Sequence, residues 1–293
     1  MTRHELSILI PTYNSDCTAL TAELCRQASS INRLKFELIV ADDGSPDRTI
    51  AERNHAISTL PYCRFIDRRV NSGRAAIRNF LASEAQYKWL LFLDSDMTIT
   101  RSNFVEQYLR SEGTIVYGGY TVGKGETSNL RHLYEKKCEP HHTVEERRKH
   151  PFLHFHTGNF MVSRQVLAEH PFDERFRFYG YEDVLWGKQL HQADLEITHI
   201  DNPAGFYTFE DNIHFIEKTE EGLRTLYKFQ HELSGYSQLL TYAESIRHSP
   251  VHSLMLLWHR LFSSLERRYL CGKHPSLTVF SVYKLGYYLL LDK

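Results

Sequence analysis

Short apolar runs alternate with longer mixed segments along the first 120 residues of the chain. The three strongest runs cover residues 6–10, 36–41 and 89–93, and they end abruptly at Pro11, at Asp42-Asp43-Gly44 and at Asp94-Ser95-Asp96. Residues 63–66 and 114–117 are weaker candidates of the same kind. Short apolar runs bounded by turn residues predict buried strands.

Apolar residues at helical spacing fill the segments between these runs. Residues 19–29, 48–58 and 74–85 carry Ala, Leu, Ile, Glu and Arg in that spacing. Strands that alternate with helices predict an α/β fold, a Rossmann-like and largely parallel central sheet flanked by helices. Ligands bind just outside the carboxyl ends of the strands in such sheets, so we expect the functional site there.

The rest of the chain is less regular. Residues 120–160 predict a loop with a short surface helix, in which the charged run 145–149 is a solvated face. Residues 213–240 have a helical pattern. From Pro250 onward, apolar residues at helical spacing are combined with basic residues. We expect residues 1–240 to form one main domain and residues 241–293 to form a helical C-terminal extension.

The extension combines apolar residues at helical spacing with basic residues. Between residues 247 and 293 there are seven Lys or Arg and two acidic residues. Two interpretations remain open: the helices pack on the main domain, as an amphipathic face ordinarily does, or they lie on an anionic membrane surface. The apolar positions are Leu254, Leu257, Trp258, Leu261, Phe262, Leu265 and Tyr269.

Composition excludes several classes of protein. The chain has 293 residues, of which 42% are hydrophobic and 24% charged, as in a folded globular protein rather than a disordered one. The net charge of -1 provides no general attraction for nucleic acid. Five scattered cysteines and a first apolar run of only residues 6–10 predict a protein kept in the cytoplasm, in a reducing compartment, or at the inner face of the membrane.

Acidic residues cluster at three places, at Asp42-Asp43, at Asp94-Ser95-Asp96 and at Glu182-Asp183. Two carboxylates one residue apart can hold Mg²⁺ or Mn²⁺, which prefer oxygen ligands and often share them with phosphates. Such a pair alone is usually a surface turn. Because Asp94 and Asp96 directly follow an apolar run, and a second acidic pair follows another, we favour a metal site.

Five motifs resemble, in order and spacing, the family 2 glycosyltransferases of GT-A fold. The motifs are residues 10–14 (IPTYN), 42–45 (DDGS), 71–79 (NSGRAAIRN), 93–96 (LDSD) and 180–183 (GYED). The resemblance implies metal-dependent, inverting transfer of a hexosyl or hexosaminyl group from a nucleotide diphosphate donor, often UDP-linked. The acceptor would be a hydroxyl of a glycan or a lipid-linked glycan, as in polysaccharide biosynthesis.

The resemblance also implies roles on the donor side. Residues 11–13 would line the nucleoside pocket, Asp42 would accept a hydrogen bond from the base or ribose, and Asp43 would support it. Arg78 would bring positive charge to the nucleotide, or would instead pair with Asp42 or Asp43. The nucleotide-binding set is Pro11, Thr12, Tyr13, Asp42, Asp43, Gly73, Arg78, Asp94 and Ser95.

Metal binding and proton transfer fall on the other acidic residues. Asp96 would be the direct ligand of Mn²⁺ or Mg²⁺, with Asp94 as a second ligand nearer the ribose. Asp183 would be the general base that takes the acceptor's proton. Glu182 would bind the acceptor or position Asp183; alternatively the pair simply begins a helix, where acids are favoured.

Sugar contacts are implied at three further residues, together with one departure from the family's pattern. Gly158 and Asn159 would approach the donor sugar, and Trp186 would provide an apolar platform for a sugar ring. Related chains carry a His after an Asn-Pro pair, whereas Phe206 stands at that place here. His199 or His214 is the candidate replacement as metal ligand. The departure leaves open a nucleotide-sugar-binding protein without transfer activity.

Overall fold

The protein is built on a central seven-stranded sheet. The computed structural model describes residues 3–292, so Met1, Thr2 and Lys293, which belong to the expected domains, lie outside the described residues. The strand order is β3-β2-β1-β4-β8-β6-β9, and β8 runs antiparallel to both neighbours. The strands are β1 (Glu5–Thr12), β2 (Lys35–Asp43), β3 (Cys63–Arg68), β4 (Trp89–Leu93), β6 (Ile115–Tyr117), β8 (Asn159–Ser163) and β9 (Thr198–His199).

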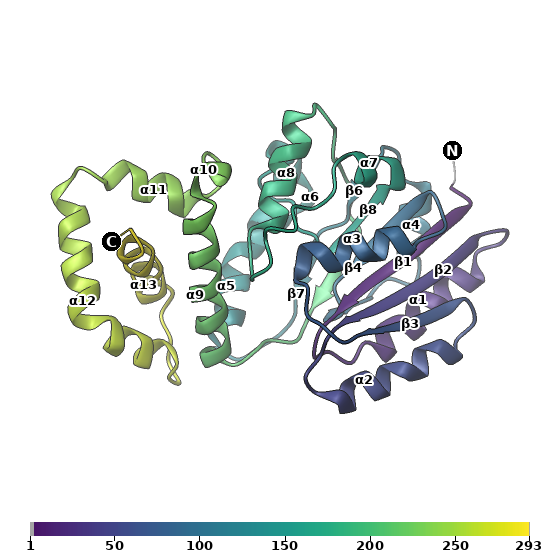
Figure 1. Ribbon diagram of the computed structural model, residues 1–293, viewed down its shortest axis with the longest axis horizontal. Coiled ribbons are helices and arrows are strands. Elements are labelled where there is room, and N and C mark those ends of the chain that lie inside the picture. The colour runs from purple at the N-terminus through teal and green to yellow at the C-terminus, as the bar shows by residue number, and fades with distance from the viewer. Residues whose placement is uncertain (1–2, 293) are drawn as a thin grey trace.

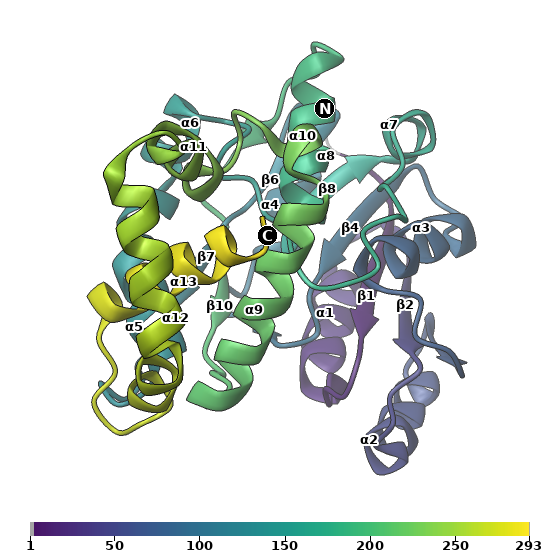
Figure 2. The ribbon, with the colours of Figure 1, turned by 60° about the vertical axis from the view of Figure 1, so that its left-hand side comes forward.

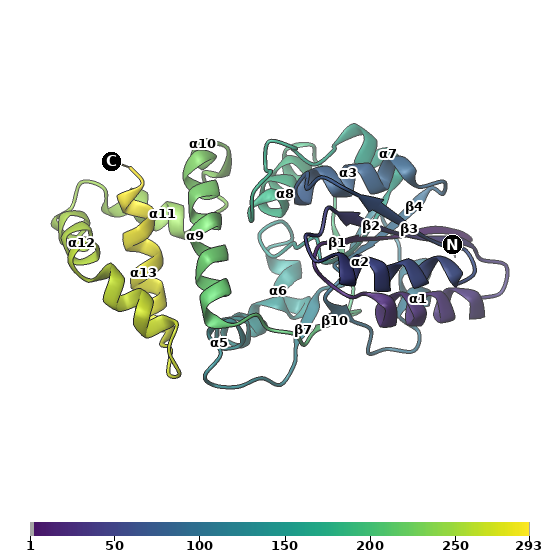
Figure 3. The same cartoon turned by 60° about the horizontal axis from the view of Figure 1, so that its bottom comes forward.

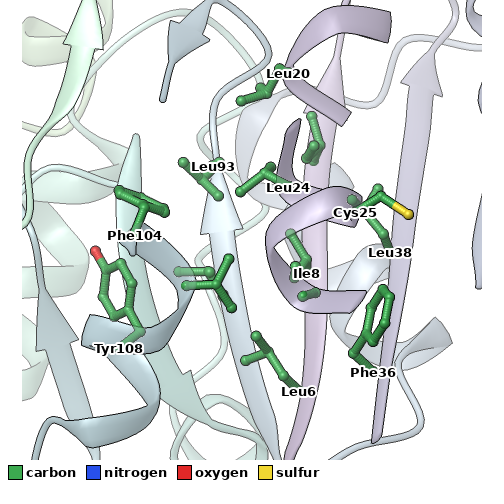
Figure 4. Packing of buried hydrophobic residues seen from close by; sticks show 14 of the residues in the cluster. Leu6, Ile8, Leu20, Leu24, Cys25, Phe36, Leu38, Leu93, Phe104 and Tyr108 are labelled. Atoms are coloured by element: carbon green, nitrogen blue, oxygen red, sulfur yellow. The ribbon is translucent and has the colours of Figure 1, made fainter. Parts of the chain in front are cut away.

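Helices cover both faces of this sheet (Figures 1 and 3). On one face, α1 (Thr18–Ser30) and α4 (Phe104–Arg110) pack on side chains such as Ile8 and Leu38 (Figure 4). On the other, α3 (Arg74–Glu84), α7 (Arg164–Glu169) and α8 (Glu182–Gln192) enclose Leu9 and Ile39. Successive strand residues alternate between the faces, so both sides of a strand such as β1 are apolar. The expected α/β fold with a largely parallel sheet is confirmed.

The expected helix over residues 48–58 consists of two pieces. Helix α2 (Arg48–Asn54) begins at Asp47, whose side chain accepts a hydrogen bond from the Thr49 backbone N–H. A short 3₁₀ helix, His55–Thr59, continues it toward β3. The helices predicted over 19–29 and 74–85 and all five predicted strands lie within two residues of their expected bounds. The helical pattern over 213–240 is divided, because one helix ends at Lys228, a short one covers Gln230–Leu233 and the next begins at Gln238.

Residues 120–160 contain more regular structure than the loop and short helix expected there. Strand β7 (Tyr120–Val122) joins β10 (Ala204–Phe206) and β5 (Met97–Thr98) in a second sheet. It is followed by α5 (Leu130–Cys138), a 3₁₀ turn (Glu139–His142) and α6 (Val144–Lys149). The prediction that the charged run 145–149 is a solvated face is wrong at Arg147. Its guanidinium is buried and donates to the carbonyl oxygens of Tyr117 and Gly118.

The C-terminal helices gather at the far side of the molecule from β1–β3 (Figure 1). Helix α13 is enclosed by α9, α11 and α12 (Figures 1 and 2), and its side chains share an apolar core with α8 and α9. A Cβ on Gly286 would lie 2.7 Å from the His259 side chain, so this glycine lets α13 approach α12 closely. The helices are α9 (Asn212–Lys228), α10 (Gln230–Leu233), α11 (Gln238–Ile246), α12 (Pro250–Leu270) and α13 (Leu277–Leu290).

Packing on the main part of the chain therefore accounts for α11 and α13 but not for the apolar stripe of α12. The side chains of Leu254 and Leu261 are each 65% exposed. The residues of α12 that face inward include His259 and Glu266, which are polar. Within residues 3–292, no helix is long and apolar enough to span a membrane.

Candidate functional site

A cavity of ≈ 1040 Å³ opens beyond the carboxyl end of β4. Asp94 and Asp96 line one side of it, just after that strand, and Glu182 and Asp183 at the start of α8 line another. The C-terminal helices complete the wall with Tyr242, Ser245, Phe280 and Lys284. The site is thus at the strand ends, as the sequence predicts, but the extension forms part of it.

Two arginines on the first turns of α3 hold the carboxylates together. Arg78 donates to Asp94 Oδ1 at 2.5 Å, and Arg74 donates to Asp94 Oδ2 at 3.1 Å. Arg74 also donates to Glu182 Oε1 at 2.8 Å. The Arg78 side chain is only 1% exposed, so it acts within this cluster. The alternative in which Arg78 pairs with Asp42 or Asp43 is wrong, because its carboxylate neighbours are Asp94 and Glu182.

Asp96 differs from Asp94 because its side chain is open to the cavity. Desolvation by the surrounding protein atoms and the negative charge of Asp94 raise the pKa of the Asp96 carboxyl. Both Asp94 oxygens are engaged by arginine, so Asp96 is the carboxylate of this motif that is available to a cation. No group of three or more His, Cys, Asp or Glu within residues 3–292 is arranged to hold a metal. The carboxylate of Asp96 therefore fits a divalent ion that takes its other ligands from a diphosphate.

A strained turn places Asp183 in the cavity. Gly180 and Tyr181 have φ of 91° and 69°, and α8 begins directly after them. The Asp183 carboxylate lies in the first turn of α8, where Oδ2 is 3.1 Å from His156 Nδ1. Burial alone would raise the pKa of Asp183, but the hydrogen bond and charge of His156 outweigh it and leave the pKa below its usual range. Asp183 therefore carries negative charge at neutral pH.

The acidic pair after β2 organises the loop that precedes α3. Asp43 accepts hydrogen bonds from the backbone N–H of Ser72 at 3.1 Å and of Gly73 at 2.9 Å. Gly73 has a φ of 91°, and a Cβ there would lie 2.4 Å from the Arg177 carbonyl oxygen. Asp42 Oδ1 accepts from the Ser45 N–H, whereas Oδ2 is buried without a hydrogen-bond partner among residues 3–292.

The other expected nucleotide-binding residues lie outside the cavity lining. Pro11, Thr12 and Tyr13 follow β1, whose Thr12 is paired in register with Asp42. The Thr12 hydroxyl donates to the Ser15 carbonyl, while Tyr13 is exposed. The cavity brings together six of the predicted site residues, namely Asp94, Asp96, Gly158, Asn159, Glu182 and Asp183; the other predicted site residues do not line it.

Trp186 and Asn159 are structural rather than sugar-binding side chains. Trp186 is 1% exposed and packs among Phe155, Phe160 and Phe172, so the expected platform for a sugar is wrong. Asn159 lines the cavity, but its Nδ2 donates to the carbonyl oxygens of Gly119 and Asn202 and its Oδ1 accepts from a tyrosine hydroxyl. Its side chain fixes the surrounding loops.

Phe206, which stands where the family resemblance leads one to expect a His, lies in the cavity wall. Its ring is 5.2 Å from the Arg131 guanidinium carbon. His199 is buried beside Arg147 and the Pro151 carbonyl, and His214 is exposed at the start of α9 beside Asp211. Neither lines the described cavity, so neither takes the place of the missing imidazole.

Histidines form a wall that the sequence motifs do not reveal. His156 is the partner of Asp183, and the pKa of His142 is lowered to about 2 by burial and by the neighbouring His156 and His154. The sequence features that could have indicated this wall are the His-X-His spacing at 154–156 and the adjacent His-His pair at 141–142. The wall is formed by His141, His142, His150, His154 and His156.

The family model described as "Glycosyl transferase family 2" matches residues 7–170, more than half of the chain. The chain belongs to glycosyl transferase family 2. Two uncharacterized glycosyltransferases of Haemophilus influenzae are similar to this family 2 chain, one 37% identical over 93 residues and the other 28% identical over 177 residues. These alignments cover 31% and 59% of this chain but only 29% and 65% of the relatives. The chain thus spans less than two thirds of the length of either relative.

Solved structures share the fold of this family 2 chain. S. aureus TarS (residues 1–349) in complex with UDP-GlcNAc aligns with a TM-score of 0.54 and 16% identity, over 98% of this chain and 90% of that one. The mannosyltransferase PcManGT of Pyrobaculum calidifontis, in complex with GDP-Man and Mn²⁺, aligns with a TM-score of 0.56 and 12% identity, over 99% and 88%. Both alignments extend into the C-terminal helices and confirm the GT-A fold.

Proposed function

We propose that this family 2 protein is an inverting glycosyltransferase. It moves a hexosyl or hexosaminyl group from a nucleotide diphosphate donor, with a UDP-sugar favoured, to a hydroxyl of a glycan or lipid-linked glycan. The observation that carries the proposal is that Asp96 and the ionised Asp183 face one cavity at the ends of the strands. A cation-binding carboxylate and a proton-accepting carboxylate are the two groups that this reaction needs.

The donor side rests on the loops after β1, β2 and β4. TarS binds UDP-GlcNAc and PcManGT binds GDP-Man, which supports a nucleotide sugar as the donor for a chain of the same fold. The free acceptor atom of Asp42 supports its contact with the base or ribose. Asp43 acts by holding Ser72 and Gly73 in place. We retain Pro11, Thr12, Tyr13 and Ser95 as the nucleoside-side residues.

The acceptor side centres on Asp183. Its carboxylate takes the proton of the acceptor hydroxyl while that oxygen attacks the anomeric carbon from the face opposite the diphosphate. The adjacent His156 stabilises the negative carboxylate and fixes its orientation. Glu182 acts through Arg74 and Arg78, which it holds together with Asp94. Mn²⁺ or Mg²⁺ held by Asp96 would supply positive charge to the departing diphosphate.

Residues 241–293 contribute to acceptor binding in this proposal, and residues 1–240 carry the donor site and the base. Tyr242 and Lys284 from the extension line the same cavity as Asp96. Aromatic faces and a cation in that cavity suit the apolar faces and hydroxyls of sugar rings.

A nucleotide-sugar-binding protein without transfer activity is the second candidate. The observation in its favour is Phe206, whose apolar ring lies in the cavity wall instead of an imidazole. The two candidates share a donor site and differ in whether the sugar is released from the nucleotide.

Calorimetric titration of the purified protein with UDP, and then with GDP, tests the proposal. Each titration is run with Mn²⁺ and again with a chelator. Metal-dependent binding of one nucleotide supports the donor site and selects the sugar nucleotides to assay for turnover. Binding without any turnover of the matching sugar nucleotide in the presence of glycan acceptors supports the second candidate. The absence of binding of either nucleotide contradicts both.

A further inference from the structure

We propose that the exposed face of α12 binds to an anionic lipid surface. This inference goes beyond the proposed function and does not depend on it. We define the α12 stripe as the large apolar side chains of this helix that are exposed: Val251, Leu254, Leu257, Trp258, Leu261, Phe262, Leu265 and Tyr269. At about 100° per residue, these positions fall within an arc of about 140° on the helix.

The helix carries apolar side chains on both of its sides. Its buried side combines Leu256 and Leu270 with His259 and Glu266, which hydrogen-bond at 3.2 Å, whereas further leucines occupy the exposed side. A soluble monomer rarely exposes a continuous apolar strip along a helix about 30 Å long. Because the inner side is already packed against α13, nothing within residues 3–292 covers the stripe.

Charge identifies the surface that fits the stripe. Glu266 is the single acidic residue of α12, and it is buried, where it accepts a hydrogen bond from Trp258 Nε1 at 2.7 Å. Arg268 lies within the exposed arc and Arg260 lies about 60° beyond its edge. Neither has a carboxylate partner among the described residues. An apolar face with Trp and Tyr, bordered by arginines, fits the interface of a bilayer that contains anionic lipid.

A second copy of the chain fits the stripe less well. Two stripes packed face to face would enclose Arg268 of each copy, because Arg268 lies within the exposed arc and α12 presents no exposed carboxylate to pair with it. Enclosing an unpaired charge at such a contact is unfavourable. The position of α12 at the outer edge of the molecule, far from the sheet, leaves the stripe accessible to a flat surface (Figures 1 and 3).

Vesicle binding tests the proposal with the full chain. The vesicles contain phosphatidylcholine with about one quarter phosphatidylglycerol, and vesicles of phosphatidylcholine alone serve as the comparison. Trp258 is an internal reporter, since it is 45% exposed, whereas Trp186 is buried and Trp89 is partly buried in β4. We expect co-sedimentation with the anionic vesicles, a blue shift of tryptophan emission that is absent in W258F, and weaker binding at high salt.

Two sets of variants identify the surface. L257Q and L261Q should each weaken binding about 10-fold or more, and R260Q and R268Q about 5-fold each. V70Q is the matched control, because Val70 is 70% exposed and lies outside α12; it should bind like the unaltered chain. These positions are exposed, so we expect all of these variants to keep the fold, which circular dichroism and thermal unfolding report without relying on any nucleotide.

Several results would overturn the proposal. One is failure to bind anionic vesicles, and another is equal binding to phosphatidylcholine alone. A third is a dimer by light scattering that L257Q and L261Q convert to a monomer, because the stripe would then be covered by a second copy.

Discussion

His156 Nδ1 lies 3.1 Å from Asp183 Oδ2, although the two residues belong to different segments 27 positions apart. The contact raises the pKa of His156 against the effect of burial, and it lowers the pKa of Asp183. Both shifts favour the charged pair, an imidazolium beside a carboxylate. A carboxylate held in this way keeps a fixed orientation toward the cavity and is ready to receive a proton.

Replacement of Asp183 by Asn should abolish sugar transfer and spare donor binding. The amide cannot take the acceptor's proton, so we expect turnover to fall by about 100- to 10,000-fold. Nucleotide affinity, measured by calorimetry, should stay within a few-fold of the original value. Equal loss of both would show that Asp183 belongs to the donor site instead.

The same variant should change the titration of His156, which NMR of the assigned histidine resonances can follow. In the unaltered protein the pKa of His156 lies above its usual 6.5, because the effect of Asp183 exceeds that of burial. Without the carboxylate, burial and the charge of Arg131 lower the pKa and only Glu135 still raises it, so the pKa of His156 should fall in D183N. His214, which is hydrogen-bonded to Asp211 at the surface, is the control and should titrate as before. An unchanged His156 would contradict the ion pair.

This pair should also make stability depend on pH. A raised pKa means that the folded state binds the proton of His156 more tightly than the unfolded state. The stabilisation is present in full below the unfolded pKa of about 6.5 and is lost as pH rises through the folded pKa of His156. Urea denaturation of the unaltered chain and of H156Q at pH 6 and pH 9 measures it. The difference in free energy of unfolding between the two proteins should be larger at the lower pH.

Arg78 should be essential for stability. Its buried guanidinium joins Asp94 and Glu182, and Arg78→Met would leave both carboxylates without that charge. We expect a loss of about 3–5 kcal/mol in the free energy of unfolding, as for other buried pairs deprived of one partner. Arg110→Ala is the control, because its ion pair with Glu106 is exposed and should contribute less than about 1 kcal/mol. Similar losses in the two variants would contradict a special role for Arg78.

Asp96 should control metal-dependent nucleotide binding. We expect D96N to bind the selected nucleotide equally with Mn²⁺ and with chelator, because the carboxylate open to the cavity has been removed. The raised pKa of Asp96 means that protons compete with the metal at a higher pH than for an ordinary Asp, so the affinity of the unaltered protein should weaken as the solution is made acidic. Asp201→Asn, an exposed position paired with Arg101, should leave the metal effect intact.

The sequence predicts the part of the site that follows directly from strand ends. Asp42, Asp94 and Asp96 come immediately after apolar runs, and parallel strands bring such ends to one edge. The partners of these residues depend on contacts between distant segments, which local patterns do not encode. Arg147 illustrates this, since a mixed-charge run predicts solvent exposure and yet its guanidinium fills a gap between loop carbonyls.

The sequence also could not predict which side of the amphipathic helix α12 faces the core. Helical spacing shows that α12 has an apolar side, but the same spacing is compatible with that side facing the core or facing outward. Packing shows which side faces inward, since His259 lies against Gly286 and the buried positions are Leu256, His259, Glu266 and Leu270. The prediction that Trp186 is a platform for a sugar ring was wrong for a related reason. An aromatic residue near acidic residues in the sequence is compatible with a sugar platform and with a hydrophobic core.

The mixed origin of the cavity wall has a consequence for specificity. Asp96 and Asp183 share the cavity with side chains such as Tyr242 and Lys284, which come from helices outside the segment that the family model matches. Changes in those helices can reshape part of the wall without disturbing the strand-end loops that would hold a nucleotide. Acceptor choice in such an architecture can diverge while donor chemistry stays constant, so two chains with the same five motifs need not build the same linkage.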